Sequence, residues 1–534
     1  MAKILDCTLR DGGYVNNFDF GEKIIIDIIS KLSLASIDII ECGFLKAGAF
    51  DKNKSLFGNT KDIKRVIKKK NPASMYVAML QYGEIDAKYI ENRSDKSIDG
   101  IRLTFHEHEI DGAFEVAKQL KEKDYCVFMQ PVGTMTYTEE ALLTLVDRIN
   151  ALNPYAFYIV DTLGTMYKKD LLKMFALIDG KLNKSIKLGF HSHNNLQLSF
   201  SNAQELLELD TERDIIIDSS IFGMGRGAGN LNTELVTQYI NDNICPTYNT
   251  LELLDILDTY IKPLSIQYQW GYDAPYYISS ATGCHPNYAS YLMNKQTLRV
   301  QDIYNILNRL DNCQRALFNK GYIEEQYKLF MNNHIDDTSA LNNIREQIKD
   351  KKIILIAPGK SISKNENIDK INSLIATGEY TVISINFCPS AFPLDMIFTS
   401  NLKRFNSMEE LCGKATEKLS VIVTSNIASD NTDRMNVIDY MSYTNQDPAI
   451  FDNAGVMCLN MLKRIGAYQI SLAGFDGFKT ATEETFAEKA MYTEMETEQR
   501  MIINTAMINK LSELSTQMSI TFLTDSYYDK ENLS

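Results

Sequence analysis

The first 240 residues alternate between short apolar segments and longer amphipathic ones. Eight apolar, β-rich segments predict strands at residues 3–8, 36–44, 74–80, 100–105, 125–130, 156–162, 187–193 and 214–223. Apolar residues at i, i+3 and i+4 predict helices between them, at residues 21–35, 60–70, 111–123, 138–152 and 169–182. Buried parallel strands read as nearly continuous apolar runs, and a barrel closes at eight strands. The pattern therefore predicts a (β/α)₈ TIM barrel over residues 1–243.

The remaining chain divides into two further regions. Residues 244–345 are helical in pattern, at 250–264, 299–310 and 324–331, and predict a helical extension that completes the site of the barrel. A second series of alternating strands and helices then runs through residues 350–534. This series has fewer repeats than a barrel, so we expect an open, Rossmann-like sheet.

Polar side chains follow the predicted barrel strands at their C-terminal ends. They include Asp6 to Asp11, Glu41, His106, His108, Gln130, Asp161, Thr162, His191, His193 and Asn230. Active sites of TIM barrels lie at this face of the barrel. The loops at the opposite ends are also polar, as loops generally are, but they are rich in lysine and lack histidine. The distribution predicts a functional site at the C-terminal face.

His191 and His193 are candidate metal ligands. They are separated by one residue on a strand, so both imidazoles face the same side, about 7 Å apart at the backbone. This spacing also occurs by chance on buried strands, but Asp11 at the same predicted rim supplies a carboxylate. Two imidazoles and a carboxylate leave open positions at which a divalent ion chelates a 2-oxo acid. Asn230 either adds an oxygen ligand or caps the following helix.

Arg10 precedes the candidate ligand Asp11. A fixed guanidinium beside a developing negative charge lowers the barrier to enolate formation, which gives Arg10 a catalytic role. The alternative is that Arg10 is only an ion-pair partner of Asp6 or Glu41. The glycine-rich segment 223–230 lacks the spacing of a phosphate-binding loop, so we expect its glycines to allow close backbone approach to the site.

Five motifs in order resemble one enzyme family. The segments "LRDGG", "ECGF", "DTLGTM", "HSHNNLQLS" and "GRGAGNLNTE" are similar to motifs of the HMG-CoA lyase-like metal-dependent lyases and synthases, with the greatest similarity to the 4-hydroxy-2-oxovalerate aldolases among them. The resemblance implies a carbon–carbon lyase that depends on Mn²⁺ or Mg²⁺. It also implies that Asp11, His191 and His193 hold the ion, that Arg10 stabilises pyruvate enolate, and that Thr162 contacts the bound carboxylate. Further expected substrate contacts are Glu41, His106 and Asp161.

The chain departs from this family at one catalytic position. Such aldolases carry a histidine three residues after the metal-binding aspartate, and this chain has Tyr14 there. A phenol with a pKa near 10 is a poor base at neutral pH, so proton transfer moves elsewhere unless a cation lowers that pKa. Other candidates for the acid/base are His285, Tyr288, and His106 or His108, each of which is equally explained as a packed ring. We therefore expect an aldehyde partner different from the family's usual one.

The second half resembles the Rossmann-like bacterial sialyltransferases more faintly. The resemblance lies in residues 354–362 and 453–478. It implies nucleotide or nucleotide-sugar binding, with glycosyl transfer either lost or using another base, because no histidine follows His334. Residues at predicted strand ends either line such a site or form turns; they are Asn386, Ser400, Asn401 and Asp476.

Composition narrows the class of protein. Hydrophobic residues make up 45% of the chain and charged residues 23%, which is typical of a globular protein. The formal net charge of −14 argues against nucleic acid as a partner. Nine cysteines without a CxxC pair indicate reduced thiols, and neither a signal segment nor an 18-residue apolar run is present, so we expect a cytoplasmic protein without membrane contact. Its oligomeric state stays open.

Three hypotheses of function follow. In the first, the barrel makes or breaks a carbon–carbon bond between pyruvate enolate and an aldehyde, and the fusion to the second domain suggests a sugar-derived aldehyde and a role in carbohydrate biosynthesis. In the second, the barrel is a Claisen-type acyl-CoA synthase or lyase. In the third, the chain is a sugar-nucleotide-binding protein whose barrel has lost catalysis.

Overall fold

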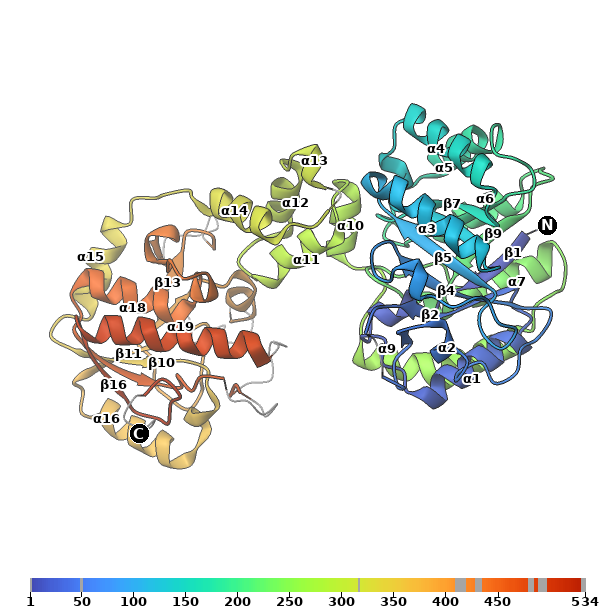
Figure 1. The fold of residues 1–534 in the computed structure, drawn as a ribbon. Coiled ribbons are helices and arrows are strands. Elements are labelled where there is room, and N and C mark those ends of the chain that lie inside the picture. Colours follow the sequence, from blue (N-terminus) through green and yellow to red (C-terminus); the bar gives the residue numbers. More distant parts are fainter. Residues whose placement is uncertain are drawn as a thin grey trace. The chain divides into compact units, whose positions relative to one another are not determined.

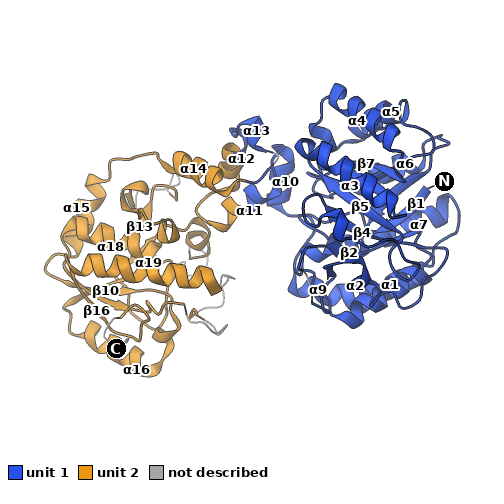
Figure 2. Cartoon of the chain, in the orientation of Figure 1, with its two compact units in different colours: residues 1–290, 307–318 blue, residues 291–306, 319–534 orange. Residues whose placement is uncertain are grey.

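A computed structural model describes residues 2–48, 51–315, 317–408, 419–427, 435–478, 485–487 and 497–529. The chain forms two compact units (Figure 2). Unit 1 comprises residues 1–290 and 307–318, and unit 2 comprises residues 291–306 and 319–534.

Unit 1 is built around a closed parallel barrel (Figure 1). Its strands are β1 (Ala2–Asp6), β2 (Ile39–Leu45), β4 (Met75–Gln81), β5 (Gly100–Phe105), β6 (Cys126–Pro131), β7 (Ala156–Asp161), β8 (Lys187–Ser192) and β9 (Ile215–Ser219). They pair in the order β1-β9-β8-β7-β6-β5-β4-β2, and β1 pairs with β2 to close the barrel. The short strand β3 (Leu56–Phe57) adds to the edge of β2 at the C-terminal end.

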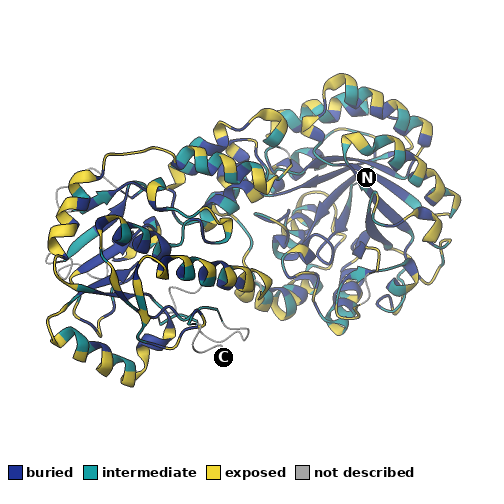
Figure 3. Cartoon of the chain, turned by 60° about the vertical axis from the view of Figure 1, so that its left-hand side comes forward, coloured by how far each residue is buried: buried dark blue, intermediate teal, exposed yellow. Residues whose placement is uncertain are grey.

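Helices surround this barrel on the outside. They are α1 (Glu22–Leu34), α2 (Thr60–Ile63), α3 (Ile110–Glu122), α4 (Glu139–Leu152), α5 (Lys168–Asp179), α6 (Ser199–Leu207) and α7 (Thr233–Asn243). The strands are almost entirely buried, whereas the helices bury one face and expose the other (Figure 3). One apolar cluster joins the inner faces of the helices to the outward side chains of the strands, and a smaller one, with Leu5, Val77 and Phe128, fills the barrel. The predicted TIM barrel is confirmed.

Helices of the predicted extension continue the chain. They are α8 (Thr250–Ile256), the π-helical turn η6 (Leu257–Ile261), α9 (Lys262–Gln267), α10 (Ala274–Ala281), α11 (Pro286–Asn294), α12 (Val300–Asn308), α13 (Asn312–Arg315), α14 (Lys320–Met331) and α15 (Thr338–Gln347). The residues of this extension are divided between the two units. Its role in completing the site stays a prediction.

Unit 2 contains a parallel sheet of seven strands. The strands are β10 (Lys352–Ile356), β11 (Tyr380–Ile385), β12 (Met396–Thr399), β13 (Ser420–Thr424), β14 (Met435–Ile438), β15 (Gln469–Ala473) and β16 (Ser519–Phe522). Their order is β14-β13-β12-β11-β10-β15-β16. Helices α15, α16 (Asn365–Ala376), α18 (Ala454–Ile465) and α19 (Thr497–Ser515) pack against these strands. The predicted second parallel α/β domain is confirmed.

Within the described ranges, no helix combines the length and the apolar character that crossing a membrane requires.

Candidate functional site

The loop after β1 places Arg10 and Asp11 at the C-terminal end of the barrel. The backbone N–H groups of Arg10 and Asp11 both donate to the carbonyl of Cys7, at 3.0 and 2.8 Å, which folds the chain sharply as it leaves the strand. The carbonyl of Leu9 accepts from the hydroxyl of Ser55 at 2.6 Å. A Cβ on Gly13 would lie 2.3 Å from the ring of Phe18, so this tight loop requires glycine there.

Three candidate ligands meet at this end of the barrel. Asp11, His191 at the end of β8, and His193 just beyond it are all buried, and one ligand atom from each lies within 4.8 Å of the others. Donors that share one ion lie up to ~4.2 Å apart at bonds of about 2.1 Å. The three groups therefore need only a small closing movement to hold a divalent cation.

Asn230 joins this cluster from the loop after β9. Its side-chain Nδ2 donates to Oδ2 of Asp11 at 2.6 Å and to the carbonyl of Met224 at 3.2 Å. The N-cap residue of α7 is Asn232, so Asn230 does not cap that helix. A Cβ on Gly225 would lie 2.2 Å from Nδ2 of Asn230 and 2.9 Å from Oδ2 of Asp11. The glycine lets the backbone approach the cluster closely, as the sequence predicts.

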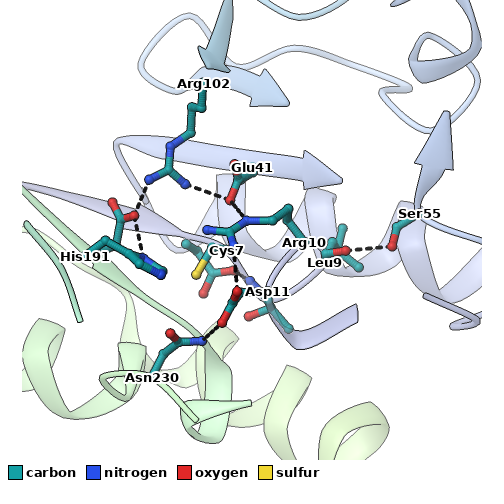
Figure 4. Close-up of polar contacts among 12 residues, drawn as sticks. Cys7, Leu9, Arg10, Asp11, Glu41, Ser55, Arg102, His191 and Asn230 are labelled. Atoms are coloured by element: carbon teal, nitrogen blue, oxygen red, sulfur yellow. Dashed lines mark hydrogen bonds and ion pairs between the residues drawn. The ribbon is translucent and has the colours of Figure 1, made fainter. Parts of the chain in front are cut away.

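A buried network of charges lies beside the cluster and includes Glu41 and Arg102 (Figure 4). Oε2 of Glu41 accepts from Nε of Arg10 at 2.8 Å and from Nη1 of Arg102 at 2.7 Å. Arg102 also pairs with Asp218 on β9, whose Oδ2 lies 2.9 Å from Nδ1 of His191. When Nδ1 of His191 donates to this carboxylate, its Nε2 is left with a lone pair for a metal ion. The network therefore orients both a ligand and the guanidinium of Arg10.

The electrostatic environment favours the ionisation states that bind a cation. Burial alone would raise the pKa of Asp11, but Arg10, the two histidines and the hydrogen bond from Asn230 together hold that pKa well below its usual range. Burial lowers the pKa of His193 to about 4, so its imidazole is neutral at neutral pH. Burial would also raise the pKa of Asp218, but Arg102, His191 and Arg10 together lower it. A carboxylate and a neutral imidazole are the forms that ligate metals.

Four buried polar atoms of this cluster have no partner among the described residues. They are Nη2 of Arg10, Oε1 of Glu41, Nδ1 of His193 and Oδ1 of Asn230. Leaving such atoms unpaired costs about 1–3 kcal/mol each. Two of them are potential metal ligands and one is a cationic donor beside them. The residues present therefore fit a divalent cation together with an oxygen-rich anionic ligand.

Tyr14 lies at the rim of the site, where its side chain is 42% exposed. Its ring packs edge-on against Phe18, and the guanidinium carbon of Arg226 lies 5.5 Å from the ring centroid. Partial burial raises the pKa of Tyr14 above its usual value. The phenol is therefore protonated at neutral pH, which makes it a hydrogen-bond donor and not a base.

Thr162 and Asp161 lie at the end of β7, and their side chains organise the adjacent loops. The hydroxyl oxygen of Thr162 accepts from the N–H of Gly133 at 2.9 Å, which leaves its proton available to a ligand. The carboxylate of Asp161 accepts from the N–H groups of Thr165 and Met166, each at 3.0 Å. Burial raises the pKa of Asp161 to about 6. The carboxylate of Asp161 thus bonds its own loop, whereas its backbone carbonyl accepts from the N–H of His193 at 3.2 Å.

The predicted histidines after β5 make their described contacts with each other and with their own turn, and not with the buried cluster. His106 and His108 stack on each other with centroids 5.7 Å apart, and His108 is exposed. The backbone N–H of His106 donates to the carboxylate of Glu109. These contacts are local to the turn that precedes α3.

The two predicted residues from the extension also make local contacts. Tyr288 is fully buried, and its hydroxyl lies 2.8 and 2.7 Å from the carbonyls of Gln314 and Leu317. His285 is partly buried beside Phe318, and burial lowers its pKa to about 4. Their roles in proton transfer stay predictions.

Sequence reasoning missed two members of the buried network, Arg102 and Asp218. A signal for both was present, since each interrupts an otherwise apolar strand segment, "GIRLTF" and "DIIIDSS". A charged residue is almost never fully buried unless it is paired. Arg226, whose guanidinium lies over the ring of Tyr14, was missed too. The interpretation of its glycine-rich loop considered only the glycines.

The residues predicted at the strand ends of the second sheet have separate roles. Asn386 and Asp476 line one cavity at the C-terminal ends of the strands. Ser400 donates its N–H to the side chain of Asn386, and Asn401 accepts from the N–H of Arg404. Ser400 and Asn401 therefore shape the loop after β12.

Comparisons with known proteins match the barrel. Residues 1–259 match the HMGL-like family. The 4-hydroxy-2-oxovalerate aldolase of Geobacillus genomosp. 3 is 26% identical over 272 residues, which cover 49% of this chain and 77% of the relative. The oxaloacetate decarboxylase of Mycobacterium tuberculosis is 24% identical over 239 residues, covering 43% of this chain and 67% of the relative.

A solved structure is similar as well. The N-terminal domain of a putative aldolase from Bacteroides vulgatus is 28% identical, covers 55% of this chain and 96% of its own, and superposes with a TM-score of 0.48. The predicted carbon–carbon lyase is confirmed at the level of the family, whereas the resemblance of the second half stays a prediction. The N-terminal half of this chain, residues 1–259, is an HMGL-like domain of the aldolase and lyase type.

Proposed function

We propose that the barrel is a divalent-metal-dependent carbon–carbon lyase or aldolase that joins pyruvate enolate to an aldehyde or releases it. Mn²⁺ or Mg²⁺ is the proposed ion, held by Asp11, His191 and His193, with Oδ1 of Asn230 as a further ligand. The observation that carries this proposal is the set of unpaired buried atoms around Asp11. They offer ligands to a cation and a hydrogen-bond donor to an anion in one place.

The residues of the chain divide the work of enolate formation. When bound, the cation supplies a Lewis acid for the carboxylate and keto oxygens of a 2-oxo acid. Nε and Nη1 of Arg10 are held by Glu41 and Asp11, so the guanidinium is fixed and its unpaired Nη2 is free to donate to the enolate oxygen. A donor oriented before the reaction needs no reorganisation as charge develops. The free proton of Thr162 is a donor for the substrate carboxylate.

Tyr14 is proposed to act on the aldehyde. Because its phenol is protonated and lies at the exposed rim, it is suited to donate to the aldehyde oxygen as the carbon–carbon bond forms. Arg226 beside it adds positive charge at the rim, which favours an aldehyde that carries an anionic group.

The proposal extends to the second unit. We propose that it binds a nucleotide sugar and that the aldehyde is derived from a sugar, which would place the chain in cytoplasmic carbohydrate biosynthesis. Support comes from the parallel sheet and from the cavity at the C-terminal ends of its strands, where nucleotides bind in such folds.

Exchange of pyruvate methyl protons with D₂O tests the barrel reaction without knowledge of the aldehyde. We expect metal-dependent exchange in the full chain and a loss of more than ~100-fold in Asp11→Asn. Asp19→Asn is a matched control, since Asp19 lies exposed in the same β1–α1 loop. Equal exchange rates in wild type and Asp11→Asn would refute the proposal. Exchange of label with an acyl-CoA thioester instead of pyruvate would favour the Claisen-type reaction.

A further inference from the structure

The cavity of unit 2 that Asn386 and Asp476 line lies where the strand order of the sheet reverses. From β10 the chain proceeds to β11 on one side, whereas β15 and β16 lie on the other side of β10. Such a reversal of strand order is the place where open parallel sheets form a crevice at the C-terminal ends of their strands. A cavity of about 230 Å³ occupies this position, bounded by Pro358, Asn386, Arg404, Gly455 and Asp476 among others.

Arg404 gives this cavity a positive charge. It lies in the helical residues 402–408 after β12 and is partly buried. Its guanidinium makes no hydrogen bond and no ion pair with any residue in the described part of the chain. Burial lowers the pKa of Arg404, and no neighbouring carboxylate opposes that effect. An arginine remains protonated in a protein, so the cavity holds a cation with which no described carboxylate forms an ion pair.

The carboxylate of Asp476 is engaged elsewhere. It accepts from the N–H of Ser361 at 2.7 Å and from the hydroxyl of Ser361 at 2.5 Å. Those bonds fix the loop after β10 against the loop after β15. A Cβ on Gly359 would lie 2.3 Å from the carbonyl of Gly474, so the two loops pack backbone to backbone. The crevice is thus a built feature of the fold.

The remaining walls combine an electropositive end with aromatic surface. The N-cap Asn453 and the first residues of α18, Ala454 and Gly455, line the cavity, and the positive end of that helix dipole adds to the charge of Arg404. Phe475, Phe478 and Phe486 line it as well. Aromatic side chains provide flat apolar surface on which a ring can stack.

We propose that this cavity binds a phosphate ester with a flat ring, of the nucleotide class, whose phosphate pairs with Arg404 and whose ring packs on the phenylalanines. A guanidinium pairs with phosphate through two parallel hydrogen bonds, and these remain available because the carboxylate of Asp476 in the lining is bonded to Ser361. The inference specifies the site and the chemistry of the ligand proposed above for unit 2. It does not depend on the reaction of the barrel.

Calorimetric titration of the full chain tests this site. The probes are uridine diphosphate, cytidine monophosphate, uridine and inorganic phosphate. We expect a nucleotide to bind with 1:1 stoichiometry, inorganic phosphate more weakly, and uridine at least ~10-fold more weakly than its diphosphate. Arg404→Met should weaken the nucleotide at least ~10-fold, whereas Lys403→Met, which removes an exposed neighbouring charge, should not.

A second variant tests the same cavity independently, in case Arg404→Met fails to fold. Ala454→Phe fills the cavity from the first turn of α18 and should abolish binding without touching Arg404. The site is refuted if no probe binds, if Arg404→Met binds like wild type, or if uridine binds as tightly as its diphosphate. Pyruvate exchange measured on the same wild-type sample separates the two proposals, because exchange without nucleotide binding refutes this inference alone.

Discussion

The barrel and the second sheet present two sites of the same architectural kind with opposite electrostatics. Both lie at the C-terminal ends of parallel strands, where loops converge. At the barrel, the carboxylates of Asp11, Glu41 and Asp218 face the guanidiniums of Arg10 and Arg102, which leaves one negative charge in excess. At the second sheet, Arg404 has no described counterion.

This difference indicates what each site is built to bind. A densely paired network holds its own groups rigid. Its one excess negative charge is available to bind a cation. An arginine left unpaired in a cavity offers its charge to an anionic ligand. Placement on the fold therefore predicts where a ligand binds, whereas the local balance of charge predicts its sign.

The largest expected effect is a difference in protein stability between the variants of Arg102 and Arg404. Arg102→Met leaves Asp218 buried without its guanidinium partner and takes one of two guanidiniums from Glu41, so the barrel should lose about 3–5 kcal/mol in its free energy of unfolding. Arg404→Met removes an unpaired charge and should not destabilise unit 2. Fluorescence of Trp270, the only tryptophan, reports urea unfolding of the barrel unit, and circular dichroism reports the whole chain. Equal losses in both variants would contradict the comparison.

Arg10→Lys should slow pyruvate exchange while leaving the affinity for the metal ion nearly unchanged. A lysine keeps the charge but cannot bond Glu41, Asp11 and a substrate oxygen with a fixed fork, so pyruvate exchange should fall by about 100-fold. Metal affinity, measured by calorimetry, should change little. A variant that exchanges at the wild-type rate would show that Arg10 only supports the structure.

Asp218→Asn tests the orientation of His191. The carboxylate fixes the ring through Nδ1, so its loss should weaken Mn²⁺ binding by about 10–100-fold. Titrations well below the melting temperature of the variant avoid a contribution from unfolding. The control is Asp170→Asn, at an acidic residue in the first turn of α5. Unchanged affinity in Asp218→Asn would exclude a positioning role.

Tyr14→Phe should have the smallest effect, on the aldehyde step. Loss of the phenolic donor should slow condensation or cleavage by about tenfold while pyruvate exchange falls less. The ring and its packing on Phe18 are kept, so folding is preserved. If both rates fell equally, Tyr14 would act on the enolate and not on the aldehyde.

The sequence predicted the fold and the grouping of Asp11, His191 and His193 for a common reason. Strand count, apolar runs and motif order depend on local patterns, and these placed Asp11, His191 and His193 at one end of the barrel. One predicted helix, at residues 60–70, is helical only at Thr60–Ile63. β-branched Val66 and Ile67 have low helix propensity, and both are buried beyond the end of that helix.

The partners of charged residues were not predictable from spacing. Arg102 meets Asp218 across 116 positions of sequence, and Arg10 meets Glu41 across 31. Such pairs depend on register around the closed barrel, which no local pattern encodes. The unpaired state of Arg404 was equally hidden, because the absence of a partner is a property of the packed structure.

The central claim is that one divalent cation binds between β1 and β8. Titration of the metal-stripped full chain with Mn²⁺, followed by electron paramagnetic resonance, counts the ions and reports their ligands. We predict one tight site per chain with nitrogen couplings from two imidazoles, lost in Asp11→Asn and in His193→Ala. A tight site that persists unchanged in both variants, or no tight site in the wild type, would contradict the account.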